Sequence, residues 1–411
     1  TASFLTVLGW TFGSTRQSGE CRLLSFGTLT SSILLLSVSI AAVFADEPAV
    51  RIYLANDDHT DYFWTADAET YDHTFADMLD FHLQLMDETA DNPSPYQSRF
   101  NADGWFWLKS YERQKTPAEF ERVIERVRDG HLGVPLNAMV SCYGGQPAEA
   151  VLRGMYYAGK LERKYDLRIP LAVAMENNTL PLGLASLWAG AGAKYSWRGV
   201  CACSPKVMST EGLKHRDHEI YWYAGHDGQQ VLMKWHSLAS SDNRAIGGYA
   251  EAFSPAAAVE FLDSDAAFLK RYRAPGAAQP YAVRGAFGYG WDALGRKTGE
   301  PYALAPNRYP ETDHFHEVAE AKSHAKRQVI VSNEADFFQD FETEYGDVLP
   351  SQTVTHGNEW DLYSASMAET SARVRRAVEQ LRAAEAMATM VSLHDPDFIR
   401  GHDAARDDAF T

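Results

Sequence analysis

A cluster of polar and aromatic residues follows a short apolar run near residue 50. The run Val50–Ala55 predicts a β-strand, and the sequence N-D-D-H-T-D-Y-F-W follows it directly. His59 and Asp61 are two residues apart, so in extended chain their side chains point to the same side. An imidazole and a carboxylate at a strand end make half of a divalent-metal site. Trp64 offers a wall for a sugar ring, although the cluster also suits a polar loop with a capping aspartate.

A second candidate group is a carboxylate that follows another buried run. Pro170–Met175 predicts a strand, and Glu176 comes immediately after it. A carboxylate at the carboxyl end of a strand can act as a nucleophile, a general base or a metal ligand. A structural carboxylate in a loop or at a helix cap is the alternative.

Glycines and aromatic residues surround a third candidate, in the segment A-F-G-Y-G-W-D at 286–292. The glycines allow a ligand to approach the backbone closely. Tyr289 and Trp291 offer stacking faces, and Asp292 supplies a second carboxylate. The alternative is a glycine-rich turn whose aromatic rings belong to the core.

A fourth candidate is the segment H-G-N-E-W-D-L-Y at 356–363, which begins at His356 and contains Trp360. It offers several metal ligands or acids, although a polar loop between domains has the same composition. Across the four segments, carboxylates at strand ends accompany many aromatic rings. Retaining glycosidases need one nucleophilic and one acid/base carboxylate, and a metal can grip vicinal sugar hydroxyls.

Apolar runs alternate with amphipathic stretches between Glu47 and Tyr345. This alternation predicts an α/β fold with a parallel sheet, a (β/α) barrel-like catalytic domain of irregular, seven-stranded type. Active sites of such folds lie at the carboxyl ends of the strands. The predicted strands are Val50–Ala55, Arg99–Leu108, Gly133–Val140, Pro170–Met175, Ala193–Arg198, Glu219–Ala224, Val231–His236, Tyr281–Gly288 and Val329–Ser332. The predicted helices are Thr70–Thr89, one opening at Thr116, Pro147–Tyr165, Leu182–Ala191, Ser254–Tyr272 and Met367–Met390.

The amino-acid composition limits which classes of molecule this protein is expected to bind. The 411 residues carry a net charge of -17, which argues against a nucleic-acid partner because phosphate binding needs basic patches. An acidic protein in which 12% of residues are aromatic suits a neutral carbohydrate ligand. Cys142, Cys201 and Cys203 remain beyond residue 45, and this odd number implies no disulfide framework.

The chain divides into three predicted parts. Residues 1–45 form a leader whose segment from about 22 to 45 is typical of a secretory signal cut after Ala45, which implies a secreted or periplasmic protein. Its apolar core is too short to span a bilayer, so we expect no stable membrane insertion after cleavage. Residues 46–345 form the barrel domain, and residues 346–411 begin a helical bundle.

These segments together resemble glycoside hydrolase family 38, the α-mannosidases, over residues 50–390. The stretch from His59 to Trp64 is similar to that family's first-strand H-x-D-x-x-W motif, whose His and Asp bind zinc. Glu176 stands where the family has an Asp that is both nucleophile and zinc ligand. Arg198 looks like the family's active-site Arg, and Asp292 falls where its acid/base Asp is expected.

The resemblance implies a metal-dependent retaining glycosidase with one Zn²⁺. Its metal ligands would be His59, Asp61, Glu176 and, as the nearest candidate for the family's late histidine, His356. Glu176 would be the nucleophile and Asp292 the acid/base. Substrate would contact the residues Trp64, Arg198, Tyr289, Trp291 and Trp360.

One departure from the family pattern keeps other functions open. A glutamate is one methylene longer than an aspartate, so it does not ligate a metal and attack the same carbon with unchanged geometry. A carbohydrate lyase on the same fold is therefore an alternative. A relative that kept sugar binding and lost catalysis is another.

Overall fold

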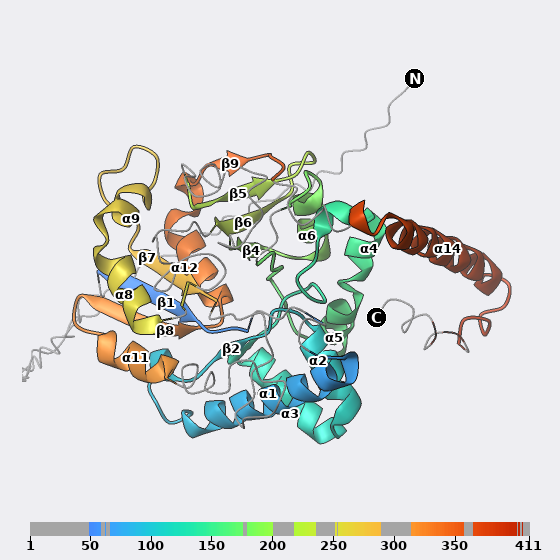
Figure 1. The fold of residues 1–411 in the computed structure, drawn as a ribbon, viewed down its shortest axis with the longest axis horizontal. Helices are drawn as coiled ribbons and strands as arrows, with labels where there is room; N and C mark the ends of the chain where they lie inside the picture. Colours follow the sequence, from blue (N-terminus) through green and yellow to red (C-terminus); the bar gives the residue numbers. More distant parts are fainter. Residues whose placement is uncertain are drawn as a thin grey trace, which may run out of the picture. The chain divides into compact units, whose positions relative to one another are not determined.

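The chain folds into short sheets and helices, seen in the computed structural model of Figure 1. The structure describes residues 49–58, 62, 66–175, 179–199, 218–235, 251–252, 254–288, 314–356, 365–400, 402 and 405. Its strands are β1 (Val50–Ala55), β2 (Phe100–Asn101), β3 (Leu132–Gly133), β4 (Tyr195–Arg198), β5 (Ile220–Ala224), β6 (Gln230–Trp235), β7 (Val283–Phe287), β8 (Arg327–Ser332) and β9 (Ser351–Gln352). Its α-helices are α1 (Ala68–Glu88), α2 (Phe106–Gln114), α3 (Pro117–Arg128), α4 (Ala148–Arg153), α5 (Tyr156–Tyr165), α6 (Leu184–Ala191), α8 (Pro255–Ser264), α9 (Ala266–Arg271), α11 (Phe315–Lys322), α12 (Ala335–Tyr345) and α14 (Ala368–Ser392). The predicted mixed α/β class is confirmed, and the closed barrel stays a prediction.

Parallel pairing dominates the sheets of the described residues. One sheet has the order β7-β1-β8, with β1 parallel to both neighbours, and β2 pairs with β3 in parallel. A third has the order β4-β6-β5-β9, in which β6 is parallel to β4 and antiparallel to β5. The Asn101 side chain donates to the carbonyls of Asn56 (2.9 Å) and Ser332 (3.1 Å). It therefore holds the carboxyl ends of β1 and β8 together.

Helix α12 packs against two of the sheets (Figure 1). Its Asp340 accepts a hydrogen bond of 2.8 Å from the Tyr53 hydroxyl of β1. On β4, the ring of Tyr195 stacks on Phe338 with centroids 5.2 Å apart, and its hydroxyl donates to Glu342 at 2.7 Å. Helix α12 is thereby fixed against β1 and the amino-terminal end of β4.

Several helices form where the sequence predicts them. Thr116 caps α3 with the reciprocal Thr116–Glu119 hydrogen bonds of a capping box. The helix predicted over 70–89 appears as α1, and the one predicted over 367–390 appears as α14. The predicted helix over 147–165 is interrupted at Gly154 into α4 and α5, and the one over 254–272 breaks at Asp265, which caps α9.

Among the predicted strands, two are largely wrong, and Pro170–Met175 forms only isolated bridges to β4, at Leu171 and Met175. Of Arg99–Leu108, only Phe100–Asn101 is strand, and α2 begins at Phe106. The aromatic residues that suggested a strand bury a helical face, where Trp107 stacks on Phe75 of α1 at 4.5 Å. Of Gly133–Val140, only the first residue belongs to β3. Pro135 lacks the N–H that a continuing ladder needs.

The outer parts of the chain leave two predictions untested. The leader over residues 1–45 lies outside the described residues, and the division predicted at residue 345 stays a prediction. No helix in the described part of the chain is long and apolar enough to cross a membrane.

Candidate functional site

Polar residues end strand β1 inside the protein. Asn56, Asp57 and Asp58 follow it directly and are all buried, at most 4% exposed. Asp57 pairs with Asn101 across a parallel bridge, beside the end of β2. Burying two consecutive carboxylates is costly unless they are hydrogen-bonded, paired with a cation or bound to a metal, and such groups cluster at functional sites.

A third buried carboxylate follows β8. Glu334 is 2% exposed and lies in the left-handed backbone region, with φ of +63°. Its amide donates to the Ser332 hydroxyl at 2.9 Å, and its Oε2 accepts a 2.8 Å hydrogen bond from the Trp197 indole of β4. A glutamate held in this conformation stores backbone strain, which is common where a side chain must be aimed.

Charge and burial set the protonation of Glu334. Burial raises the pKa of its carboxyl well above the ordinary value, and the nearby Asp57 charge raises this pKa further. The Trp197 hydrogen bond and the Lys234 charge oppose the rise. Glu334 is therefore a carboxyl group that keeps its proton at a higher pH than an exposed glutamate.

We expect the substitution Glu334→Gln to flatten the pH dependence of stability. Between the ordinary pKa of 4.5 and the raised folded value, the unfolded chain has released this proton and the folded chain has kept it. The free energy of unfolding of the wild type therefore contains a contribution from Glu334 that falls as pH rises through this window. Glutamine keeps an oxygen for Trp197 and removes that term.

Urea unfolding of both proteins between pH 5 and 8 measures the effect. The variant should gain stability relative to wild type as pH rises, whereas Glu342→Gln, on the same helix, should follow wild type. Parallel stability curves for wild type and Glu334→Gln would contradict the prediction.

A buried ion pair joins the neighbouring strand ends. Lys234 of β6 donates to Glu251 at 2.8 Å, and both side chains are less than 10% exposed. The amide of Phe287, the last residue of β7, donates to the same Glu251 oxygen at 3.3 Å. Burial lowers the pKa of Lys234, which the Glu251 charge opposes. The pair fixes the carboxyl end of β6 beside that of β7.

Trp235 lies between two residues singled out by the sequence. The Arg198 guanidinium is fully buried, 3.9 Å from the centroid of the Trp235 ring. The ring of His356 lies 4.8 Å from the same tryptophan, and its Nε2 is 3.4 Å from the Tyr221 hydroxyl. The structure thus brings both Arg198 and His356 into contact with the Trp235 side chain.

The segments that carry these two residues are pinned by backbone pairing. His356 exchanges both backbone hydrogen bonds with Leu180, at 3.0 and 3.1 Å. Met175 forms a parallel bridge with Arg198 and has a φ of +36°, which is strained for a methionine. The residue directly before Glu176 is therefore held beside the end of β4.

Most predicted site residues lie outside the described part of the chain. They are His59, Asp61, Trp64, Glu176, Tyr289, Trp291, Asp292 and Trp360. Their described neighbours are ordered: Asp58 precedes the first segment, Met175 the second and Gly288 the third. Gly288 accepts a 2.9 Å hydrogen bond from the Ala252 amide, beside Glu251. Trp197 contacts both Glu334 and Phe287, so these strand ends surround one place.

The donors predicted for zinc suit that ion chemically, since two imidazoles and two carboxylates are ligands it prefers. Three of those four residues are outside the described ranges, and His356 is the fourth. Among the described residues, no group of three or more His, Cys, Asp or Glu side chains is placed to hold a metal. Zinc binding therefore stays a prediction.

Sequence analysis missed several buried ionisable residues of this region, namely Asp57, Asp58, Lys234, Glu251 and Glu334. The rule that selected Glu176 applies equally to Glu334, because Glu334 follows the predicted strand Val329–Ser332 after a single residue. Asp57 and Asp58 belong to the same N-D-D-H segment as His59. For Lys234 and Glu251 no sequence signal exists, since their pairing depends on how β6 and β7 meet.

Comparisons with solved structures find proteins of similar fold. An α-mannosidase from Enterococcus faecalis V583 matches with a TM-score of 0.51 at 16% identity, over 75% of this chain and 31% of that one. A glycosyl hydrolase family 38 protein from Enterococcus faecalis matches with a TM-score of 0.44 at 16% identity, over 74% of this chain and 28% of that one. No protein-family profile and no curated protein sequence matches.

The relationship is one of fold, because 16% identity and a TM-score of 0.51 carry no closer assignment. The chain spans less than a third of the length of the mannosidase that it matches.

Proposed function

We propose that this protein is a glycoside hydrolase that cleaves α-linked sugars, of α-mannosidase type and with retention of configuration. One observation carries the proposal. Buried carboxyl, ammonium and indole groups from the carboxyl ends of β1, β4, β6 and β8 gather at one place, in a fold like that of an α-mannosidase. Active sites of parallel α/β folds lie at this edge of the sheet.

The proposed reaction uses two carboxylates, Glu176 directly after Met175 and Asp292 beyond the end of β7. Glu176 attacks the anomeric carbon while Asp292 gives its proton to the departing glycosidic oxygen, which forms a glycosyl-enzyme ester and free alcohol. Asp292 then takes a proton from water, whose oxygen attacks the same carbon and releases Glu176. Two displacements restore the original configuration.

The described residues supply the support for this chemistry. Met175 fixes the chain immediately before Glu176 through its bridge to Arg198. The Lys234–Glu251 pair fixes the end of β7, five residues before Asp292. Glu334 brings into the same region a carboxyl group whose pKa is raised by burial and by the charge of Asp57.

Hydrolysis of an aryl α-mannoside, followed by proton NMR of the first product, tests the proposal. The α-anomer of the free sugar should appear before mutarotation. Release of an unsaturated sugar would identify a lyase instead. Sugar binding without turnover would identify a binding protein and overturn the proposed activity.

We further propose that activity depends on one Zn²⁺ held by His59, Asp61, Glu176 and His356. The ion would supply a grip on two sugar hydroxyls when bound. Dialysis against a chelator should lower α-mannoside hydrolysis at least about tenfold, and zinc should restore it. The variant His356→Ala should bind zinc more weakly in equilibrium dialysis, whereas His394→Ala, on the exposed end of the chain, should not. Full activity after complete removal of metal would contradict metal dependence.

A further inference from the structure

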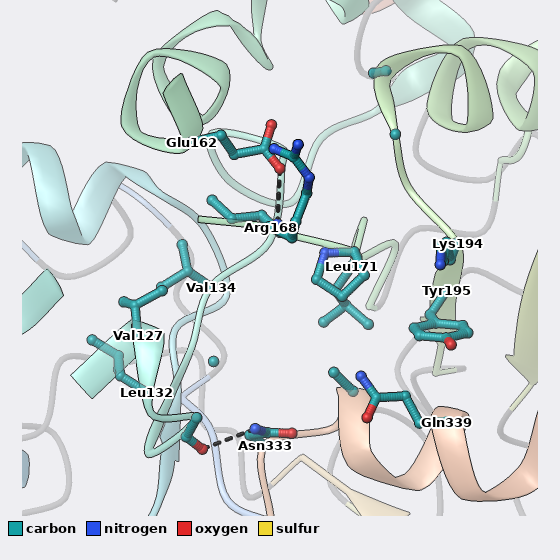
Figure 2. Close-up of a pocket in the computed structure, with 17 residues that line it drawn as sticks. Val127, Leu132, Val134, Glu162, Arg168, Leu171, Lys194, Tyr195, Asn333 and Gln339 are labelled. Atoms are coloured by element: carbon teal, nitrogen blue, oxygen red, sulfur yellow. Dashed lines mark hydrogen bonds between the residues drawn. The ribbon is translucent and has the colours of Figure 1, made fainter. Parts of the chain in front are cut away.

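A cavity of about 590 Å³ is lined by residues from several segments of the fold. Its lining comes from β3, from the amino-terminal end of β4, from the chain before Leu171, from Asn333 after β8, and from α12 (Figure 2). On β4, Tyr195 lines the cavity while Arg198 lies three residues further along, roughly 10 Å away at the strand's rise per residue. The cavity therefore reaches from the amino-terminal end of β4 to Asn333 and Ala335, which flank Glu334 in the chain.

The walls of this cavity differ in chemistry. Figure 2 shows Val127, Leu132 and Val134 along one wall. Lys194 and Gln339 lie on the facing side, and Arg168 lies beside Glu162 at one end. A volume of this size is typical of sites for small organic molecules, which combine apolar walls with a few polar groups.

Two cations of the cavity have no carboxylate partner. Across the described ranges, neither Arg168 nor Lys194 forms an ion pair, and the only hydrogen bond of the Arg168 side chain is to the Leu167 carbonyl at 3.0 Å. The Glu162 carboxylate is engaged elsewhere, since its Oε1 accepts a 2.9 Å hydrogen bond from the Ile169 amide. Unused N–H donors therefore remain on both cations, in a chain whose net charge is -17.

We infer that this cavity binds a small organic molecule that carries an oxyanion, with its apolar body against the wall formed by Val127, Leu132 and Val134. A phosphate or a carboxylate accepts hydrogen bonds from a guanidinium in fork geometry and from an ammonium as a point charge. The amide of Gln339 adds a neutral donor. A body the size of one sugar ring fits the volume.

Isothermal titration of the intact protein with four probes tests the inference: inorganic phosphate, a hexose 6-phosphate, a hexuronate and the neutral hexose. The hexose 6-phosphate or the hexuronate should bind more tightly than the neutral hexose, and affinity should fall as salt rises because the cations are exposed. A preference between the two anionic sugars identifies phosphate or carboxylate as the recognised group. Binding of the neutral hexose as tightly as of both anionic sugars would overturn the inference.

Substitutions of residues that line the cavity test whether the anionic sugar binds there. Arg168→Gln and Lys194→Gln should each lower the affinity for the preferred anionic sugar about tenfold, since a charge-assisted hydrogen bond contributes this much to binding. Lys164→Gln, on the outside of α5, should bind as wild type does. Ala191→Leu narrows the cavity without altering its charge. It should lower the affinity for the anionic sugar and leave the affinity for inorganic phosphate unchanged. Binding that is insensitive to all of these substitutions, or that no probe shows, would refute the site. Hydrolysis of neutral glycosides is not part of this readout, so its outcome stands apart from the proposed catalytic function.

Discussion

Replacing Glu176 or Asp292 with alanine should lower α-mannoside hydrolysis by about 10²–10⁴-fold, because each carboxylate forms or breaks a bond in the proposed reaction. The two losses should differ in kind. In Asp292→Ala, a substrate with a good leaving group should react faster than one with a poor leaving group, because a good leaving group departs without receiving a proton. Without the nucleophile, both substrates are slow.

Added azide separates the two roles further. In Asp292→Ala, azide should attack the glycosyl-enzyme and give the α-glycosyl azide, with two inversions in total. In Glu176→Ala, azide should enter the vacated space and give the β-glycosyl azide by one inversion. NMR of the products distinguishes these anomers.

The matched control is Glu369→Gln, an exposed carboxylate of α14 paired with Arg373 at 2.5 Å. It should keep wild-type activity. Melting temperatures of all variants should agree within a few degrees. Retained activity in both alanine variants would refute the assigned pair and would direct attention to Glu334 and Asp57.

The substitution Lys234→Met should destabilise the protein by about 3–5 kcal/mol, because it leaves Glu251 buried without its partner. Methionine has a similar volume, so packing beside Phe287 changes little. Urea unfolding at pH 7 measures the loss as a lower transition midpoint with an unchanged slope.

A second substitution tests the cause. Lys234→Met combined with Glu251→Leu removes both charges and should recover much of the lost stability, since a buried ion pair contributes little beyond an apolar pair of the same shape. Lys322→Met is the exposed comparison: it breaks the pair with Glu260, at 2.9 Å, and should cost less than about 1 kcal/mol. Equal losses in Lys234→Met and Lys322→Met would show that the buried pair has no special role.

Local patterns predicted the elements with strong periodicity or capping. Thr116 and Glu119 predicted the start of α3, and the apolar run Val50–Ala55 predicted β1. The sequence failed at Phe106, Trp107 and Leu108, which favour a strand locally but become buried together on a helix beside α1. Tertiary burial overrode local preference there.

The sequence by itself determined the mixed α/β class and several segments in which ionisable residues follow apolar runs, because both depend on residues adjacent in the chain. It therefore pointed to the segments at His59, Glu176 and Asp292 without showing what surrounds them. Only the tertiary structure decided that Glu334 meets Trp197, 137 residues earlier, and that Lys234 meets Glu251. These pairs form because separate strands end at one edge and must satisfy their buried charges there, a condition that no local spacing encodes.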